Sequence, residues 1–195
     1  MRLHGGFTLL ELLVVLLVIG TVITIALPRF QDMFEVRLKS SMRYMIGTIK
    51  FCFNESIIRQ TPLRLFFDLE NGTYWIAVLK VTGDTGEFVL LPSDLATPRH
   101  IPDGVRIIDV VTAHDIEKRT EGEGIFIEFY PNGFVEKAVI HLGDYYNRQY
   151  TLLTKPLTGG VEIFDDYIDF VSLVKNPLVS NEMPMGGTSG FETQQ

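Results

Sequence analysis

The sequence predicts an α+β fold in which one long N-terminal helix packs against a mostly antiparallel β-sheet. Three observations predict it. Residues 7–27 form an apolar run with a single formal charge, and residues 28–60 continue it with helical periodicity. After Thr61, short strand-like runs alternate with turn sequences. A helix followed by consecutive strands is the order typical of the α+β class.

The apolar run at 7–27 predicts a single transmembrane helix. About 20 apolar residues suffice to cross the hydrocarbon core of a bilayer as a helix, and Glu11 is the only charge in this run. An ordinary cleaved secretory signal is the alternative, but its apolar core usually spans about 7–15 residues. Arg2 precedes the run, which favours a cytoplasmic N-terminus and an exported C-terminal domain, although Arg29 follows it.

Residues 28–60 predict an amphipathic continuation of the same helix. Pro28 removes one helical hydrogen bond, so we expect a kink there, after which the helix resumes. Pro62 ends it, because the residue before a proline is pushed out of helical geometry. The apolar positions expected on the packed face are Phe30, Phe34, Leu38, Met42, Met45, Ile49, Phe53 and Ile57.

Residues 61–175 predict a β-rich domain. Asn71-Gly72 between two strand-like runs is a strong hairpin signal, and Pro131-Asn132-Gly133 predicts another turn. We expect a short strand or helical turn around 165–174, and a flexible tail at 176–195, which is rich in Gly, Pro, Ser and Thr. The expected strands are 63–69, 74–81, 87–91, 104–111, 124–130, 134–142, 150–154 and 160–164.

The charge distribution argues against nucleic-acid binding by the domain. The net charge is −7. Residues 29–59 contain six basic and three acidic residues, whereas the chain after Thr61 contains 10 basic and 20 acidic residues. Phosphate backbones attract basic surfaces, so the acidic domain is an unfavourable partner for them.

No residue pattern predicts an enzyme, a cofactor or a metal. The single cysteine, Cys52, excludes an internal disulfide and has no local motif linking it to a histidine, so we expect a structural thiol. The four histidines lack zinc-ligand spacing. Asp165, Asp166 and Asp169 could offer oxygen ligands to calcium, but without an EF-hand pattern a solvated turn or helix cap is the simpler interpretation. We expect residues 114–124 to form an exposed loop that could serve as a partner surface.

The start of the chain resembles the class III leader and transmembrane helix of type IV pilins and type II secretion pseudopilins. In that family a small residue precedes a cleavage site, which is followed by a short motif ending in glutamate. The matching residues here are Gly6, Phe7, Thr8, Leu9, Leu10 and Glu11.

The C-terminal part is similar to the H-type minor pseudopilins, the GspH/FimT group. That group shows a strand ending in Pro-x-Gly and a Thr-Gly before the last strand, matched here by Pro131, Gly133, Thr158 and Gly159. The resemblance implies a pilin-like, non-enzymatic minor pseudopilin of the type II secretion pseudopilus, which takes part in protein export across the outer membrane. It implies a bacterial inner-membrane location with the C-terminal domain in the periplasm.

The resemblance also implies how the N-terminus is used. Residues 1–6 would be a prepilin leader, and prepilin peptidase would cut between Gly6 and Phe7 and methylate the new amine of Phe7. Gly5 stands where the family often has a basic residue. Glu11 would then pair with the Phe7 amine of an adjacent subunit, or else simply complement the N-terminus of its own helix. The implied partners are other major and minor pseudopilins and the inner-membrane assembly platform.

Two other functions are compatible with the resemblance. A minor type IV pilin that primes pilus assembly would differ mainly in the machine it joins. A FimT-like DNA-uptake pilin would need a basic C-terminal region, whereas residues from Gly143 onward are predominantly acidic. A non-enzymatic pseudopilin is therefore the function that the sequence favours.

Overall fold

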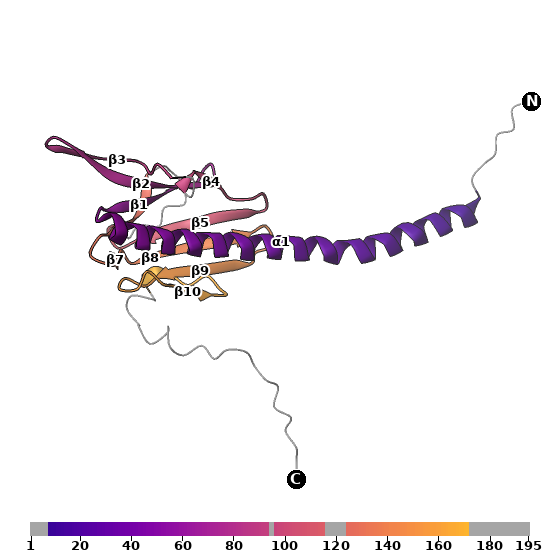
Figure 1. The fold of residues 1–195 in the computed structure, drawn as a ribbon. Coiled ribbons are helices and arrows are strands. Elements are labelled where there is room, and N and C mark those ends of the chain that lie inside the picture. Colours follow the sequence, from indigo (N-terminus) through magenta and orange to yellow (C-terminus); the bar gives the residue numbers. More distant parts are fainter. Residues whose placement is uncertain (1–7, 94–95, 116–123, 172–195) are drawn as a thin grey trace, which may run out of the picture.

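The computed structural model describes residues 8–93, 96–115 and 124–171, and side chains at 25–33 are not described. The expected leader 1–6, Phe7, the tail 176–195 and most of the loop 114–124 therefore lie outside the described residues. Figure 1 shows one long helix, α1 (Leu9–Arg59), whose C-terminal half lies against two β-sheets while its N-terminal half extends away from them.

Helix α1 is capped at both ends by local interactions. Thr8 is the N-cap, and its Oγ1 accepts the Glu11 N–H at 3.3 Å. The helix is continuous through Pro28, and the predicted kink stays a prediction. At the other end Gln60 adopts a left-handed conformation with φ 52°, and the Thr61 N–H donates to the Ser56 carbonyl. This arrangement satisfies carbonyls of the last turn before Pro62.

The first sheet is antiparallel and has the order β3-β2-β1-β6-β7, with β4 paired to β2. The predicted Asn71-Gly72 hairpin is confirmed: Asp68 pairs with Thr73, and Gly72 has φ 58°. The predicted turn at 131–133 joins β6 to β7. The strands are β1 (Leu63–Asp68), β2 (Thr73–Thr82), β3 (Thr85–Leu90), β4 (Arg99–His100), β6 (Ile125–Tyr130) and β7 (Phe134–Val135).

The second sheet has the order β10-β9-β8-β5 and is also antiparallel. The predicted strand 134–142 is divided at Glu136–Lys137, so that β7 stays in the first sheet and β8 joins the second. The buried Glu136 carboxylate fixes this crossing, because it accepts the His114 N–H at 2.9 Å and the Glu128 N–H at 3.3 Å. The strands are β5 (Val105–Thr112), β8 (Ala138–Asp144), β9 (Gln149–Thr154) and β10 (Val161–Phe164).

The core lies between α1 and both sheets, since the helix contacts β1 and β6 of the first sheet and β5 and β8 of the second. Near the end of α1, the buried positions are shifted by one residue from the prediction. Cys52 is fully buried, whereas Phe53 is only half-buried at the edge of the core. The fully buried helix side chains are Leu38, Met45, Ile49, Cys52 and Ser56.

A second, smaller cluster covers the opposite face of the second sheet. Phe164 and Phe170 pack there on Val111, Val139 and Leu153. The segment between them is held by hydrogen bonds to β9, since the Ile168 N–H donates to Thr151 Oγ1 at 2.9 Å. Residues 170 and 171 have helical geometry, so the expected short element near 165–174 begins as a helical turn.

Candidate functional site

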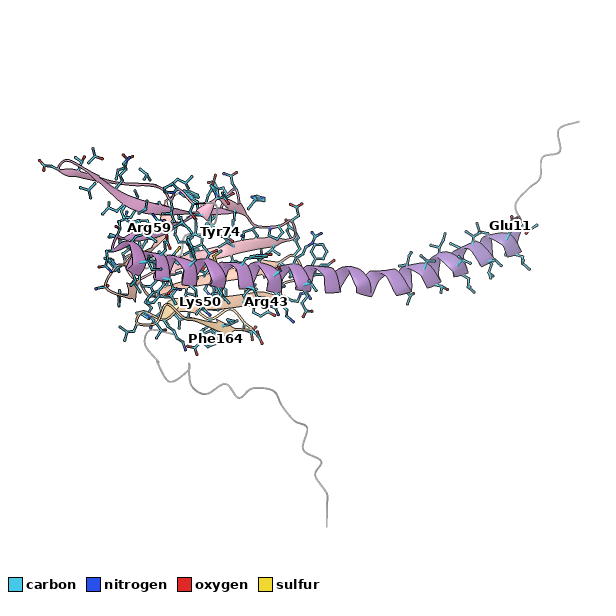
Figure 2. All side chains as sticks on the ribbon, in the orientation of Figure 1. Glu11, Arg43, Lys50, Arg59, Tyr74 and Phe164 are labelled. Carbon is cyan, nitrogen blue, oxygen red and sulfur yellow. The ribbon has the colours of Figure 1, made fainter. Side chains whose placement is uncertain are left out.

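Glu11 lies in the first turn of α1, at the end of the helix farthest from the domain (Figure 2). Its side chain is exposed, and no ion pair to it is present among the described residues. Thr8 is the N-cap, which was not predicted from the sequence. A threonine followed three residues later by a glutamate has the spacing of a capping box. The Thr8 cap places the Glu11 carboxylate beside the positive end of the helix dipole.

The N-terminal half of α1 exposes an apolar surface that the domain does not cover. The large apolar side chains from Leu9 to Ile23 are exposed, with Leu9 82% and Leu17 63% accessible. Soluble monomers rarely expose contiguous apolar patches larger than a few hundred Å². We therefore expect either lipid or another protein to cover this apolar surface.

Hydroxyl groups in this segment are satisfied by the helix itself. Thr21 Oγ1 donates to the Leu17 carbonyl and Thr24 Oγ1 to the Gly20 carbonyl, each at 2.8 Å. Such i−4 bonds leave neither hydroxyl proton in need of water. The segment can therefore be surrounded by an apolar medium without burying an unsatisfied donor.

Among the described residues, no helix is long and apolar enough to cross a membrane.

Of the four site residues predicted from the sequence, the structure places two. Glu11 is described in full, and Pro28 is described as part of the continuous helical backbone. Gly6 and Phe7 lie outside the described residues. The proposed pairing of Glu11 with an amine stays a prediction.

The Cys52 thiol lies in the core, where desolvation by burial raises its pKa well above the ordinary value, helped by the nearby Glu55 charge. A fully buried, neutral thiol is a poor nucleophile because the thiolate is the reactive form. The structural role expected for Cys52 agrees with this placement.

His141 is also fully buried, and its ring makes structural contacts. Its Nδ1 lies 2.5 Å from Asp109 Oδ1 and its Nε2 lies 3.0 Å from the Ile168 carbonyl oxygen. Tyr167 stacks on the ring at 3.9 Å and donates its hydroxyl to Asp109 Oδ2. Nε2 therefore holds the 165–170 segment to the second sheet, whereas Nδ1 contacts Asp109 on the neighbouring strand β5. Within the described residues, no three His, Cys, Asp or Glu side chains gather as a metal site.

Residues 1–27 match the protein family described as the prokaryotic N-terminal methylation motif. No curated protein matches the chain.

Solved structures with a similar fold are minor pseudopilins. A structure of the minor pseudopilin EpsH from the type II secretion system of Vibrio cholerae has a TM-score of 0.53 and 11% identity, and covers 68% of this chain and 98% of its own. A crystal structure of the same protein gives 0.54 and 13%, covering 68% and 96%. The solution structure of Escherichia coli GspH gives 0.52 and 11%, covering 66% and 88%.

These comparisons confirm two expectations from the sequence. The chain has a pilin-like fold, with a helix packed on antiparallel sheets as in the H-type minor pseudopilins. Its N-terminus carries the methylation motif. The family resemblance is therefore supported both by the N-terminal motif and by the fold of the domain.

Proposed function

We propose that this protein is a non-enzymatic minor pseudopilin of a type II secretion system. The observation that carries the proposal is the continuity of α1, which joins an exposed apolar segment containing Glu11 directly to a domain with the fold of minor pseudopilins. A continuous helix of this kind couples the position of the N-terminal segment to the domain. That is what a filament subunit requires.

The segment 7–27 inserts into the bacterial inner membrane, with the N-terminus in the cytoplasm and the domain in the periplasm. The exposed side chains from Leu9 to Ile23 and the internally bonded Thr21 and Thr24 support this topology. The methylation motif at 1–27 supports cleavage between Gly6 and Phe7 by a prepilin peptidase, followed by methylation of the Phe7 amine.

Glu11 selects the register of the neighbouring subunit. A carboxylate costs roughly 2.5–3.5 kcal/mol at the centre of a membrane helix on insertion scales and less near the helix end, where Glu11 lies, so a nearby opposite charge is still favoured. A mature N-terminus at Phe7 supplies an α-amine that is largely protonated at neutral pH. An adjacent subunit can present this amine to Glu11 once both helices lie side by side in the membrane.

The partners are then the other major and minor pseudopilins, the prepilin peptidase and the inner-membrane assembly platform. Assembly of the short filament from these subunits would drive export of folded proteins across the outer membrane. A minor type IV pilin would use the same anchor and the same carboxylate. The two EpsH structures named above come from a type II secretion system, which favours the secretion role.

The experiment is co-purification of the full chain with the other pseudopilins from native membranes. Replacing Glu11 by alanine is expected to lower the co-purified amount by at least about tenfold, because an intramembrane charge pair is lost. Glu55→Ala is the matched control, since it removes a carboxylate from the same helix within the folded domain, where Glu55 pairs with Arg59.

Two results would contradict the proposal. Equal incorporation and secretion of the Glu11→Ala and wild-type chains would remove the assembly role of Glu11. Co-purification with pilus components in place of secretion components would assign the chain to a type IV pilus.

A further inference from the structure

A groove runs beside α1 where the helix crosses strands β2 and β4. It consists of two adjoining hollows of about 240 and 220 Å³, which share Tyr44 and Arg99 in their linings. The helix contributes one wall, from Ser40 to Phe51, and the opposite wall includes Ile76 and the segment after Arg99. We call this feature the Tyr44 groove.

The described lining of the Tyr44 groove contains two cationic side chains and no carboxylate. Arg43 and Arg99 line it, and neither forms an ion pair in the part of the chain that the structure describes. Among the described residues, no acidic side chain lines either hollow. Arg99 lies over the Tyr44 ring at 5.7 Å, which orients its guanidinium group while leaving its hydrogen-bond donors available. In an otherwise acidic protein, the groove offers uncompensated positive charge.

Two hydroxyl groups of the helix wall already have acceptors within the helix. Ser41 Oγ donates to the Arg37 carbonyl and Thr48 Oγ1 to the Tyr44 carbonyl, each at 2.9 Å. The charged donors that the described lining offers to a ligand are those of the two arginines, beside the uncharged hydroxyl groups of Ser40 and Tyr44. A carboxylate is the protein group that a guanidinium binds best, because both are planar and can form two parallel hydrogen bonds.

Gly47 opens the middle of the helix wall. It is exposed, and a Cβ added to it would meet nothing within 4 Å. Glycine inside a helix is less stable than alanine, so nothing within the described domain explains its presence. Its absent side chain leaves the Tyr44 ring, 59% exposed, and Phe51 accessible from outside.

We propose that the Tyr44 groove binds an acidic segment of a neighbouring protein subunit. A carboxylate of the partner lies between Arg43 and Arg99, and an adjacent apolar side chain fills the space over Gly47 against Tyr44 and Phe51. A symmetric dimer through this surface is disfavoured, because it would place the same arginines opposite each other. The inference rests on the proposed function only for the identity of the neighbouring subunit.

The test is photo-crosslinking in native membranes, with a crosslinking amino acid at Ser40 of the full chain and identification of the attached peptide by mass spectrometry. We expect the attached peptide to contain an aspartate or glutamate. Arg43→Glu and Arg99→Glu should each lower the crosslinked yield at least about tenfold. Changing the partner's acidic residue to lysine should restore it. Lys80→Glu is the matched control, because Lys80 is an exposed cation on β2 outside the groove.

Gly47 provides an independent test that separates binding from folding. Gly47→Ala should unfold at a temperature no lower than that of the wild type, while Gly47→Leu should fold equally well and lose the crosslink. A crosslink unaffected by charge reversal, an attached peptide without acidic residues, or a groove-to-groove crosslink would overturn the proposal. So would binding of a fluorescent 20-nucleotide oligothymidylate that Arg43→Glu abolishes. Retained co-purification with pseudopilins in those cases would leave the proposed function intact.

Discussion

The ring of Phe53 on α1 lies against Gly159, in the turn between β9 and β10, so closely that a Cβ at this position would overlap the ring. Gly159 also has φ 60°, a conformation that other residues adopt only with strain. The Thr158-Gly159 pair that the sequence analysis singled out therefore has a packing role. It lets the helix approach the edge of the second sheet.

We predict that Gly159→Ala lowers the free energy of unfolding by about 2–5 kcal/mol, from left-handed strain of about 1–2 and overpacking of about 1–3 kcal/mol. Gly83→Ala is the control, because Gly83 has φ 63° and no atom within 4 Å of an added Cβ. It should lose only the strain contribution. Chemical denaturation measures both, and equal losses would contradict the packing role of Phe53.

Replacing His141 by leucine should destabilise the domain by about 3–5 kcal/mol, because among the described residues it leaves the buried Asp109 carboxylate with only the Tyr167 hydroxyl as a side-chain partner. Urea denaturation measures the loss. The double variant with Asp109→Leu should be more stable than His141→Leu alone, since the isolated charge is then removed. A double variant that is no more stable would show that the contact between Asp109 and His141 is unimportant.

Acid should weaken the contact between α1 and the turn before β9. Lys39, with Arg148, lowers the pKa of Glu35, whose carboxylate bonds both side chains. A carboxyl group with a lowered folded pKa contributes stability above its unfolded pKa of about 4.3, and that stability is lost as the pH falls through the folded value.

The measurement is the unfolding temperature of wild type and Glu35→Gln between pH 7 and pH 3. We expect the wild type to be the more stable at pH 7 and the difference to vanish at the acidic end. Glu70→Gln is the control, because Glu70 is exposed and forms no ion pair among the described residues. A difference that grows as the pH falls would contradict the role of Glu35.

Cys52 should be unreactive in the folded protein. Burial raises the pKa of its thiol, so the thiolate forms in the unfolded chain above about pH 8.5 but not in the folded one. Thiol-specific reagent should label the chain only on denaturation, and stability should decline above that pH. Rapid labelling of native protein at pH 8 would contradict the burial of Cys52.

Two substitutions near the N-terminus separate the two roles considered for Glu11. Thr8→Val removes the hydroxyl that caps α1 but leaves the carboxylate, at a cost of about 1 kcal/mol. We expect Thr8→Val to co-purify with the other pseudopilins almost as well as wild type, whereas Glu11→Ala does not. Equal losses in both variants would indicate that Glu11 acts only on its own helix.

Most of the local structure could be predicted because it depends on nearby residues. Short strand-like runs separated by turn sequences predicted the strands, Asn71-Gly72 predicted the hairpin, and Pro62 predicted the end of α1. These signals act over a few residues, so a single sequence contains them. The spacing between Thr8 and Glu11 could also have predicted the N-cap, a signal that was missed.

The arrangement of the sheets could not be predicted, because it depends on contacts between distant residues. The division of the strand at 134–142 follows from the Glu136 carboxylate, whose hydrogen-bond donors come from positions 114 and 128. The Tyr44 groove likewise brings Arg43 of α1 to Arg99 of β4. Neither pairing leaves a local signal in the sequence.

The proposed assembly role depends on a mature N-terminus at Phe7, and the mass of that terminus is its most direct test. The full chain should be isolated from the native host and from a strain without prepilin peptidase. We predict that the native chain begins at methylated Phe7 and that the peptidase-free strain yields the chain beginning at Met1. A native chain that retains residues 1–6 would contradict the account, because no amine at Phe7 would then exist for Glu11 to meet.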